Sequence, residues 1–215
     1  MTAIPPHLHP GHPGDGHEPH GPVEWDDLYD RGPEWDIGRA QSAFRELADN
    51  GALTGRVLDL GCGTGEHVLM CAEHGLAATG IDISPAAINL AMHKAFDRGL
   101  RAEFRCHDAT LLAELGEQYD TVLDCGLFVH LIDDDTARTA YLDGLRSTTR
   151  VGGRYFLLCF REGGDHHRAL TLDEIAALFA DGWRVDSIDP TVLRAGPHAH
   201  EIPAWLAAFT RVRTP

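Results

Sequence analysis

The sequence has few basic residues, few cysteines and no long apolar run. Lysine and arginine account for 18 of its 215 residues, against 33 aspartates and glutamates, so the formal net charge at pH 7 is −15. A chain with this charge and no local basic cluster repels the phosphates of nucleic acids and anionic lipid headgroups. We therefore expect neither nucleic acid nor a membrane surface as a partner.

Targeting and membrane-spanning signals are also lacking. The first residues, Met1 to Pro6, have neither a basic n-region nor an apolar h-region, and no stretch approaches the ~18 apolar residues that span a bilayer. These absences predict a cytoplasmic protein. We expect it to be a monomer or a weakly associating homodimer.

The cysteines are odd in number, lie in apolar segments and show no C-x-x-C spacing. This scatter predicts reduced, buried thiols in place of disulfides or zinc ligands. They are Cys62, Cys71, Cys106, Cys125 and Cys159.

Residues 1–22 differ in composition from the rest of the chain. They are mostly histidine, proline and glycine and contain almost nothing that could enter a core, which predicts a disordered tail. The histidines could bind a divalent metal ion, but flexible ligands must be ordered at an entropic cost and nothing preorganises them, so we predict no specific metal site. Residues 23–215 are long enough for one buried core and too short for two ordinary domains.

Strand-like and helix-like segments alternate along this domain, a pattern typical of a parallel sheet covered by helices on both faces. We predict strands at Arg56–Leu60, Ala77–Ile81, Ala102–Arg105, Thr121–Cys125 and Arg154–Phe160. We predict helices near Gln41–Asp49, Glu66–Glu73, Pro85–Asp97, Asp134–Ser147 and Leu172–Ala180. Two further β-prone runs, Trp183–Ile188 and Ala204–Val212, flank a turn-rich loop at Pro190–Pro203 and predict an antiparallel hairpin at the sheet edge.

A glycine turn, Asp59-Leu60-Gly61-Cys62-Gly63-Thr64-Gly65, joins a buried strand to a helix that opens at Glu66. Strand, glycine turn and helix form a cofactor-binding arrangement, in which glycine lets a ligand lie against the backbone and allows positive φ angles. The dinucleotide pattern G-x-G-x-x-G has its third glycine where this chain has Glu66. An acid there opposes a pyrophosphate at the helix N-terminus, so we expect a cofactor without phosphates.

Two further acids end the next two predicted strands. Asp82 lies 21 residues after Gly61, where a carboxylate can accept two hydrogen bonds from a ribose diol. Asp108 could accept a hydrogen bond from an adenine amino group. Because open α/β sheets bind ligands outside the carboxyl ends of their strands, the glycine turn and both acids predict an adenosyl site at one edge.

These motifs, with Tyr119-Asp120-Thr121-Val122-Leu123-Asp124, resemble those of the class I S-adenosylmethionine-dependent methyltransferases over residues 55–160. The resemblance implies an α/β fold: a three-layer α-β-α sandwich around a seven-stranded, mostly parallel sheet of order 3-2-1-4-5-7-6, with the last strand antiparallel. It also implies S-adenosylmethionine as cofactor and S-adenosylhomocysteine as product. The residues that would contact the cofactor are Trp35, Asp59, Gly61, Cys62, Gly63, Asp82, Ile83, Asp108, Ala109 and Cys125.

A narrower resemblance covers Gly32 to Gln41, in which Trp35-Asp36-Ile37-Gly38 is similar to the entry segment of small-molecule methyltransferases of the thiopurine, thiol/halide and heterocyclic-toxin type. In that branch the segment, here about residues 23–50, is part of a lid that covers the cofactor and shapes the acceptor pocket. A small-molecule methyl acceptor is therefore the expected partner. Residues expected to contact it are Trp25, Tyr29, Phe128, His166 and His167.

Methyl transfer is an in-line displacement, so an enzyme gains much of its rate by holding the acceptor atom in line in a dry pocket. A thiolate or a heterocyclic nitrogen needs no base, whereas a hydroxyl acceptor benefits from a group that removes its proton. His130, just past the fourth predicted strand, is the expected catalytic base.

The sequence leaves several alternatives open. Thiols, phenolic heterocycles, quinol-like compounds and chalcogen anions all stay possible acceptors, because one fold and one cofactor motif serve many chemistries. A non-catalytic cofactor-binding regulator or scaffold with a metal-binding histidine tail is a second interpretation. A NAD-type oxidoreductase is a third, against which the absent third glycine and Asp108 argue.

Overall fold

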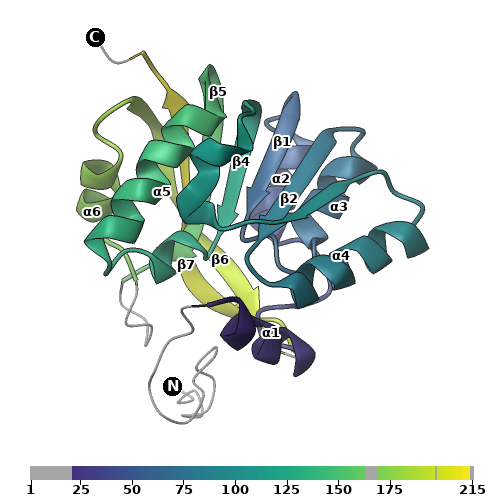
Figure 1. Ribbon diagram of the computed structural model, residues 1–215. Helices are drawn as coiled ribbons and strands as arrows, with labels where there is room; N and C mark the ends of the chain where they lie inside the picture. The colour runs from purple at the N-terminus through teal and green to yellow at the C-terminus, as the bar shows by residue number, and fades with distance from the viewer. Residues whose placement is uncertain (1–20, 163–168, 197, 214–215) are drawn as a thin grey trace.

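Seven strands form one sheet with helices on both faces (Figure 1). The computed structural model describes residues 21–162, 169–196 and 198–213. The strand order is β3-β2-β1-β4-β5-β7-β6, with parallel pairing from β3 through to β5 and β7 antiparallel to both of its neighbours, which confirms the predicted fold. The strands are β1 (Arg56–Leu60), β2 (Ala77–Asp82), β3 (Glu103–Cys106), β4 (Tyr119–Cys125), β5 (Thr149–Phe160), β6 (Trp183–Ala195) and β7 (His200–Arg211).

Strand side chains alternate between two cores, one on each face of the sheet. Leu58 and Val122 belong to the core that η1, α5 and α6 cover, whereas Val57 and Leu123 belong to the core that α2, α3 and α4 cover. Burial on both faces explains why β1 and β4 have near-continuous apolar sequences. The helices are α1 (Pro22–Asp30), α2 (Ser42–Asp49), α3 (Glu66–Glu73), α4 (Pro85–Asp97), α5 (Asp135–Thr148) and α6 (Leu172–Leu178), with the 3-10 segments η1 (Ala109–Leu115) and η2 (Phe128–His130).

The capping signals seen in the sequence operate in the structure. Ser84 Oγ accepts a hydrogen bond from the Ala87 N–H at the start of α4, next to Pro85 in the first turn. Thr171 and Glu174 form a reciprocal capping box at the start of α6. These side chains satisfy backbone donors that the first turn of a helix leaves unpaired, which fixes where each helix begins.

The predicted loop at Pro190–Pro203 is wrong, because most of it is strand. β6 and β7 pair from Trp183↔Arg211 to Ala195↔His200, which forms one long hairpin. Pro190 is tolerated because β6 is an edge strand. Pro203 is tolerated because β5 pairs with β7 only as far as Ala204, so the missing N–H of Pro203 is not needed on that side.

Two smaller predictions are also corrected. Pro22, assigned to the disordered tail, is the first residue of α1, a position at which proline loses no hydrogen bond; residues 1–20 lie outside the described part of the chain. Cys106 is exposed, because it is the last residue of the short edge strand β3, whereas Cys62, Cys71 and Cys159 are buried as predicted.

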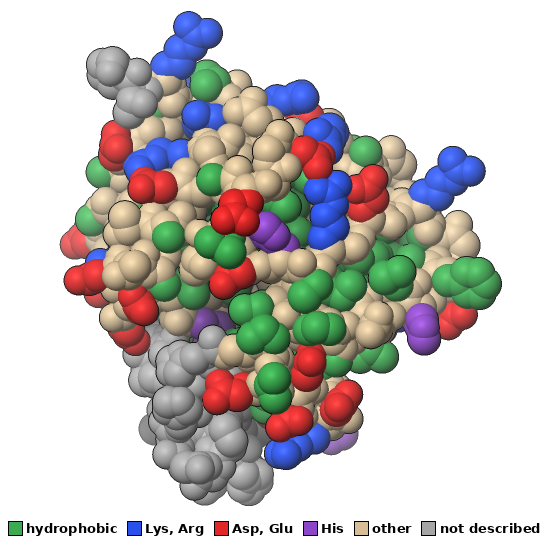
Figure 2. Space-filling model, viewed as in Figure 1, with side chains coloured by type: hydrophobic (Ala, Val, Ile, Leu, Met, Phe, Trp, Pro, Cys, Tyr) green, Lys and Arg blue, Asp and Glu red, His purple; other side chains and the backbone are tan. Residues whose placement is uncertain are grey.

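The surface shown in Figure 2 carries arginine and lysine side chains mixed with acids, together with apolar side chains over α4. The exposed apolar residues of α4 are Leu90, Met92 and Phe96. Within the described ranges, no helix combines the length and apolarity needed to cross a membrane.

Candidate cofactor and acceptor site

The glycine turn lies at the carboxyl edge of the sheet and is closely covered. Gly61, Gly63 and Gly65 have φ angles of 62°, 51° and 87°, which side chains other than glycine rarely adopt. A Cβ on Gly63 would lie 2.9 Å from the hydroxyl of Tyr29, and a Cβ on Gly61 would lie 3.0 Å from Leu127. The turn therefore meets both the N-terminal segment and the loop after β4, with no room for a larger side chain.

Asp82, at the end of β2, is held by two backbone donors. Its carboxylate accepts hydrogen bonds from Gly63 N at 2.8 Å and from Ser84 N at 2.9 Å. Burial raises the pKa of Asp82 to about 6, and the two N–H groups oppose this shift only in part. The carboxylate thus links the glycine turn to the start of α4, the place where the sequence predicted a ribose contact.

The raised pKa of Asp82 predicts a pH-dependent cofactor affinity. Protonation of Asp82 removes the negative charge that would strengthen its hydrogen bonds to the ribose hydroxyls of the cofactor. The Kd for the cofactor is therefore expected to rise by about tenfold for each pH unit below 6. Isothermal titration with S-adenosylhomocysteine between pH 4.5 and 8 measures this. The variant Asp82→Asn is expected to bind weakly with a flat profile near pH 6, and a wild-type profile that is flat there would contradict the prediction.

Asp59, in β1, is a buried carboxylate without a hydrogen-bond partner in the described chain. Both of its oxygens are inaccessible and unsatisfied. His67 Nδ1 lies 3.6 Å from Oδ2, beyond hydrogen-bond distance, while His67 Nε2 accepts a hydrogen bond from Gln41 N at 3.3 Å. A neutral His67 therefore carries its proton on Nδ1, facing Asp59. An orphaned buried carboxylate is costly, and a cationic group of a ligand would satisfy it.

Asp59 is part of a group of buried acids at this edge. Asp82 and Asp124, at the ends of β2 and β4, each have a pKa raised to about 6, chiefly by burial and further by the charge of Asp59. The concentrated negative potential favours a cationic ligand. S-adenosylmethionine, with its sulfonium and ammonium groups, matches this potential, and a pyrophosphate does not.

Glu66 does not exclude phosphates in the way its sequence position suggested. Lys94 Nζ lies 2.9 Å from its carboxylate, and Arg98 donates to both of its oxygens at 2.9 and 3.0 Å. These cations hold the pKa of Glu66 below its ordinary value against the effect of burial. The charge of Glu66 is thus compensated by these two cations. The negative potential that disfavours a phosphate-containing cofactor comes from Asp59, Asp82 and Asp124 instead.

The predicted adenine residues lie at the end of β3. Asp108 is the N-cap residue of η1, and its Oδ1 accepts hydrogen bonds from the N–H and the hydroxyl of Thr110. The His107 N–H donates to Asp82 O at 2.9 Å, so the ends of β2 and β3 are tied together. Ala109 is buried and Ile83 is half-buried beside Asp82. The structure therefore brings these residues to the same edge as the glycine turn.

Aromatic side chains of the N-terminal segment gather beside the turn. The ring of Trp35 lies 6.1 Å from those of both Trp25 and Tyr29, edge to face. Trp25 also meets His130 of η2 edge to face, with ring centroids 5.2 Å apart. We call residues 22–41 the lid, because they run from α1 across the carboxyl edge of the sheet (Figure 1).

The loop after β4 is shaped by Asp124. Its carboxylate accepts from the N–H groups of Leu127 and Phe128 and from the hydroxyl of Tyr141 at 2.6 Å. These bonds fix the turn that carries the half-buried Cys125 and the exposed His130 to the site. The sequence indicates no separate role for Asp124 beyond its place in a motif. That role depends on Tyr141, 17 residues later, and no local pattern indicates this contact.

One predicted acceptor residue is not brought to the site. Phe128 is fully buried and packs against Tyr141 and Phe179, with centroids 5.3 and 5.8 Å away, because η2 turns its side chain into the core beneath α5 and α6. Phe128 is therefore a core residue. His166 and His167 lie outside the described residues. Within those residues, no group of three or more His, Cys, Asp or Glu side chains is placed to hold a metal ion.

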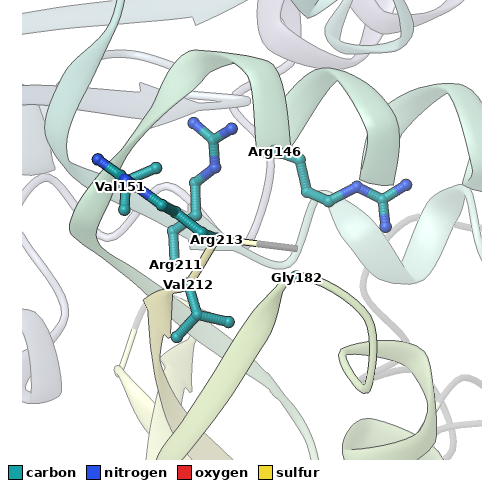
Figure 3. A pocket seen from close by; sticks show the side chains of 6 residues that line it. All are labelled: Arg146, Val151, Gly182, Arg211, Val212 and Arg213. Atoms are coloured by element: carbon teal, nitrogen blue, oxygen red, sulfur yellow. The ribbon is translucent and has the colours of Figure 1, made fainter. Parts of the chain in front are cut away.

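A pocket of about 230 Å³ lies at the opposite, amino edge of the parallel strands. Its lining includes Arg146, Arg211 and Arg213, but the guanidinium groups of Arg146 and Arg211 leave it in different directions (Figure 3). Arg146 pairs with Asp181 at 3.1 Å. The arginines therefore do not converge on a ligand, and this pocket is unrelated to the carboxyl-edge site.

Comparison with known proteins identifies the family. A model described as a methyltransferase domain matches residues 57–153. A 2-heptyl-1-hydroxyquinolin-4(1H)-one methyltransferase from Mycobacteroides abscessus is 31% identical over 169 residues, which cover 76% of this chain and 74% of that relative. The chain belongs to the class I S-adenosylmethionine-dependent methyltransferases.

Other relatives of this methyltransferase support the same family and fold. A ubiquinone biosynthesis O-methyltransferase from Parvibaculum lavamentivorans is 34% identical over 102 residues, 47% of this chain and 39% of that protein. A solved structure described with the conversion of a disulfide bond into a thioacetal group during echinomycin biosynthesis is 32% identical, with a TM-score of 0.82 over 90% of this chain and 93% of the other. The magnesium protoporphyrin IX methyltransferase of Synechocystis, with bound S-adenosylmethionine, shares the fold at a TM-score of 0.62 and 22% identity, covering 91% and 86% of the two chains.

The cofactor of this methyltransferase is S-adenosylmethionine, and the residues present fit it. The unsatisfied carboxylate of Asp59 and the carboxylate of Asp82 suit a ligand with a cationic group and hydroxyl groups, and Gly63 provides the bare backbone that a close-lying ligand requires. The cofactor group that each residue contacts stays a prediction. Sequence reasoning missed Asp36, Thr64 and Lys94, which join the lid to the turn. The Trp-Asp-x-Gly stretch contains Asp36 and is the sequence signal that indicates it.

Proposed function

We propose that this methyltransferase methylates an ionisable oxygen on a flat aromatic heterocycle. The main support for this proposal is the cluster of aromatic side chains in the lid beside the glycine turn, in which His130 packs against Trp25. The aromatic residues are Trp25, Tyr29 and Trp35. Such rings offer apolar walls to a planar acceptor, and a histidine beside them can take up a proton. The names of the relatives from Mycobacteroides abscessus and Parvibaculum lavamentivorans, a hydroxyquinolone methyltransferase and an O-methyltransferase, support the same acceptor class.

In this proposal the side chains bind, orient and exclude water. When bound, S-adenosylmethionine supplies an electrophilic methyl group on a sulfonium sulfur. Asp59 holds the ammonium group of the cofactor by charge, Asp82 holds its ribose by hydrogen bonds, and the lid rings keep water from the acceptor. His130 accepts the proton of the acceptor hydroxyl as the new C–O bond forms.

The variant His130→Ala tests this role. We expect kcat with a hydroxyquinoline acceptor to fall by about a hundredfold, because general bases contribute factors of this size. The Kd for S-adenosylhomocysteine is expected to stay near the wild-type value. The matched control is His93→Ala, which removes an exposed histidine of α4. Radiolabelled methyl transfer measures both variants.

A sulfur acceptor is the second candidate, favoured by the 32% identical structure that is described with thioacetal formation. A thiolate forms without help near neutral pH, so His130→Ala would then change kcat by less than about threefold. Parallel screens with hydroxyquinolines, phenols and small thiols separate the two. Transfer to thiols alone, with His130→Ala unimpaired, would overturn the oxygen-acceptor proposal.

A further inference from the structure

The lid is fastened to the glycine turn by an acid that methyl transfer does not use. Asp36, next to Trp35, accepts a hydrogen bond from Thr64 Oγ1 at 2.7 Å. The same hydroxyl accepts a hydrogen bond from Lys94 Nζ at 2.7 Å, and Lys94 Nζ lies 3.6 Å from Asp36 Oδ2. Because Thr64 belongs to the turn and Lys94 to α4, three separate elements meet at one buried hydroxyl.

The charges around this hydroxyl are balanced. Lys94 also pairs with Glu66, which Arg98 binds through both oxygens, so two acids face two bases. The side chains of Asp36 and Glu66 are only 22% and 9% exposed. Water therefore screens these pairs less than it screens ordinary surface pairs, and the loss of one member leaves an unbalanced charge in a partly buried place.

The ends of the lid are held elsewhere. Asp26 of α1 accepts hydrogen bonds from the Ser84 hydroxyl and from Ala86 N at the start of α4. At the other end, the side chain of Gln41 exchanges two hydrogen bonds with the backbone of Arg194, at 2.8 and 2.9 Å. Neither attachment contacts the glycine turn. Glu34 O, beside Trp35, accepts a hydrogen bond from Gly196 N at 2.6 Å, which again is outside the glycine turn. The bond of Asp36 to Thr64 thus ties the residue next to Trp35 directly to the turn.

We propose that Asp36 is a positioning residue for methyl transfer, and that its bond to Thr64 and its pairing with Lys94 hold Trp35 and Tyr29 over the bound cofactor. The lid has to open for S-adenosylhomocysteine to leave. The contacts of Asp36 with Thr64 and Lys94 therefore set how long the cofactor stays bound. The inference rests on the cofactor lying beneath the lid, as the proposed function requires, and it is independent of the acceptor.

The test compares Asp36→Ala, Lys94→Ala and the double variant, with S-adenosylhomocysteine as the probe. Each single variant is expected to raise the Kd and the dissociation rate by about tenfold, a typical loss for a charge-assisted hydrogen bond. The double variant is expected to lose little more than either single variant, because both remove one shared interaction. Asp27→Ala, which removes an equal charge from the exposed face of α1, is the matched control and is expected to behave as wild type.

Tryptophan fluorescence reports on the position of the lid, and the protection that S-adenosylhomocysteine gives against quenching reports on its closure over the ligand. Trp183 and Trp205 are buried, so quenching by acrylamide reports mainly on Trp25 and Trp35. Asp36→Ala is expected to increase quenching and to abolish the protection that S-adenosylhomocysteine gives, whereas Asp36→Asn, which can still accept from Thr64, is expected to be intermediate. Melting curves check that each variant is folded.

Three outcomes would overturn the proposal: wild-type dissociation rates in folded Asp36→Ala and Asp36→Asn, unchanged quenching, or fully additive losses in the double variant. These measurements use no acceptor, so a wrong acceptor class leaves them unaffected. Failure of the wild-type protein to bind S-adenosylhomocysteine would contradict the cofactor site itself.

Discussion

The variant Gly63→Val is expected to lose S-adenosylmethionine binding, with Kd raised by at least about a hundredfold. Gly63 has a φ angle of 51°, which costs a non-glycine residue roughly 1–2 kcal/mol, and a β-branched side chain makes the strain greater. Its Cβ would also lie 2.9 Å from the Tyr29 hydroxyl, so the lid ring must move. The N–H that Gly63 donates to Asp82 would then shift as well, which disturbs the expected ribose contact. Isothermal titration measures the loss.

The control for Gly63→Val is Gly152→Val. Gly152 also has a positive φ, 83°, but a Cβ there meets no atom within 4 Å, and the residue lies near the start of β5, at the edge away from the site. The control is therefore expected to lower the melting temperature by a few degrees through backbone strain alone and to keep the wild-type Kd. Wild-type affinity in folded Gly63→Val would contradict the assignment of the turn.

The variant Asp59→Asn is expected to change stability and affinity in opposite directions. Without ligand, the buried carboxylate has no hydrogen-bond partner among the described residues, so a neutral side chain of the same shape should stabilise the fold by about 1–3 kcal/mol. With ligand, Asp59 is proposed to meet the cofactor ammonium, and the loss of its charge should then weaken binding by about two orders of magnitude. Thermal melts and titrations on the same sample test both signs.

Asp120→Asn serves as the contrast. Asp120 accepts from Arg56 N at 2.8 Å and pairs with Arg150 at 2.8 Å near the amino end of β4, and these contacts hold the pKa of its carboxyl below the ordinary value. Its replacement is expected to lower the melting temperature and leave cofactor affinity unchanged. If Asp59→Asn also lowered the melting temperature, Asp59 would be a structural residue instead of a ligand-binding one.

The parts of the fold that local sequence determines were predictable. Helices α3 and α4 begin and end where predicted, because Gly65 and the Ser84-Pro85 pair mark their starts unambiguously. Asp82 and Asp108 were predictable for the same reason, since Asp82 ends one recognisable strand and Asp108 follows another. The second half of the hairpin was missed because Pro190 and Pro203 are turn residues by composition and become strand residues only through their place at the sheet edge.

The parts of the site that depend on distant contacts were not predictable. The sequence presents Glu66 as a lone acid, and only the packing of α4 brings Lys94 and Arg98 against it. Phe128 looks like an acceptor contact by position, yet the turn that Asp124 holds directs it into the core. The partners of Glu66 lie 28 and 32 residues away along the chain. Asp124 is only four residues from Phe128, but the ring of Phe179, against which Phe128 packs, belongs to a distant part of the sequence.

The tip of the long β6–β7 hairpin is attached to the lid. Gly196 N, at the tip of this hairpin, donates to Glu34 O in the lid at 2.6 Å, and Arg194 holds Gln41 nearby. The parts of the chain that close over the site thus come from before residue 57 and after residue 153, outside the segment that the family model matches. Under the proposed function, substitutions in these two flanking regions, which meet each other, are expected to change acceptor preference while the strands around the glycine turn keep their sequence. A fragment limited to residues 57–153 would contain the glycine turn and the loop after β4 but would lack the lid and the hairpin tip that holds it.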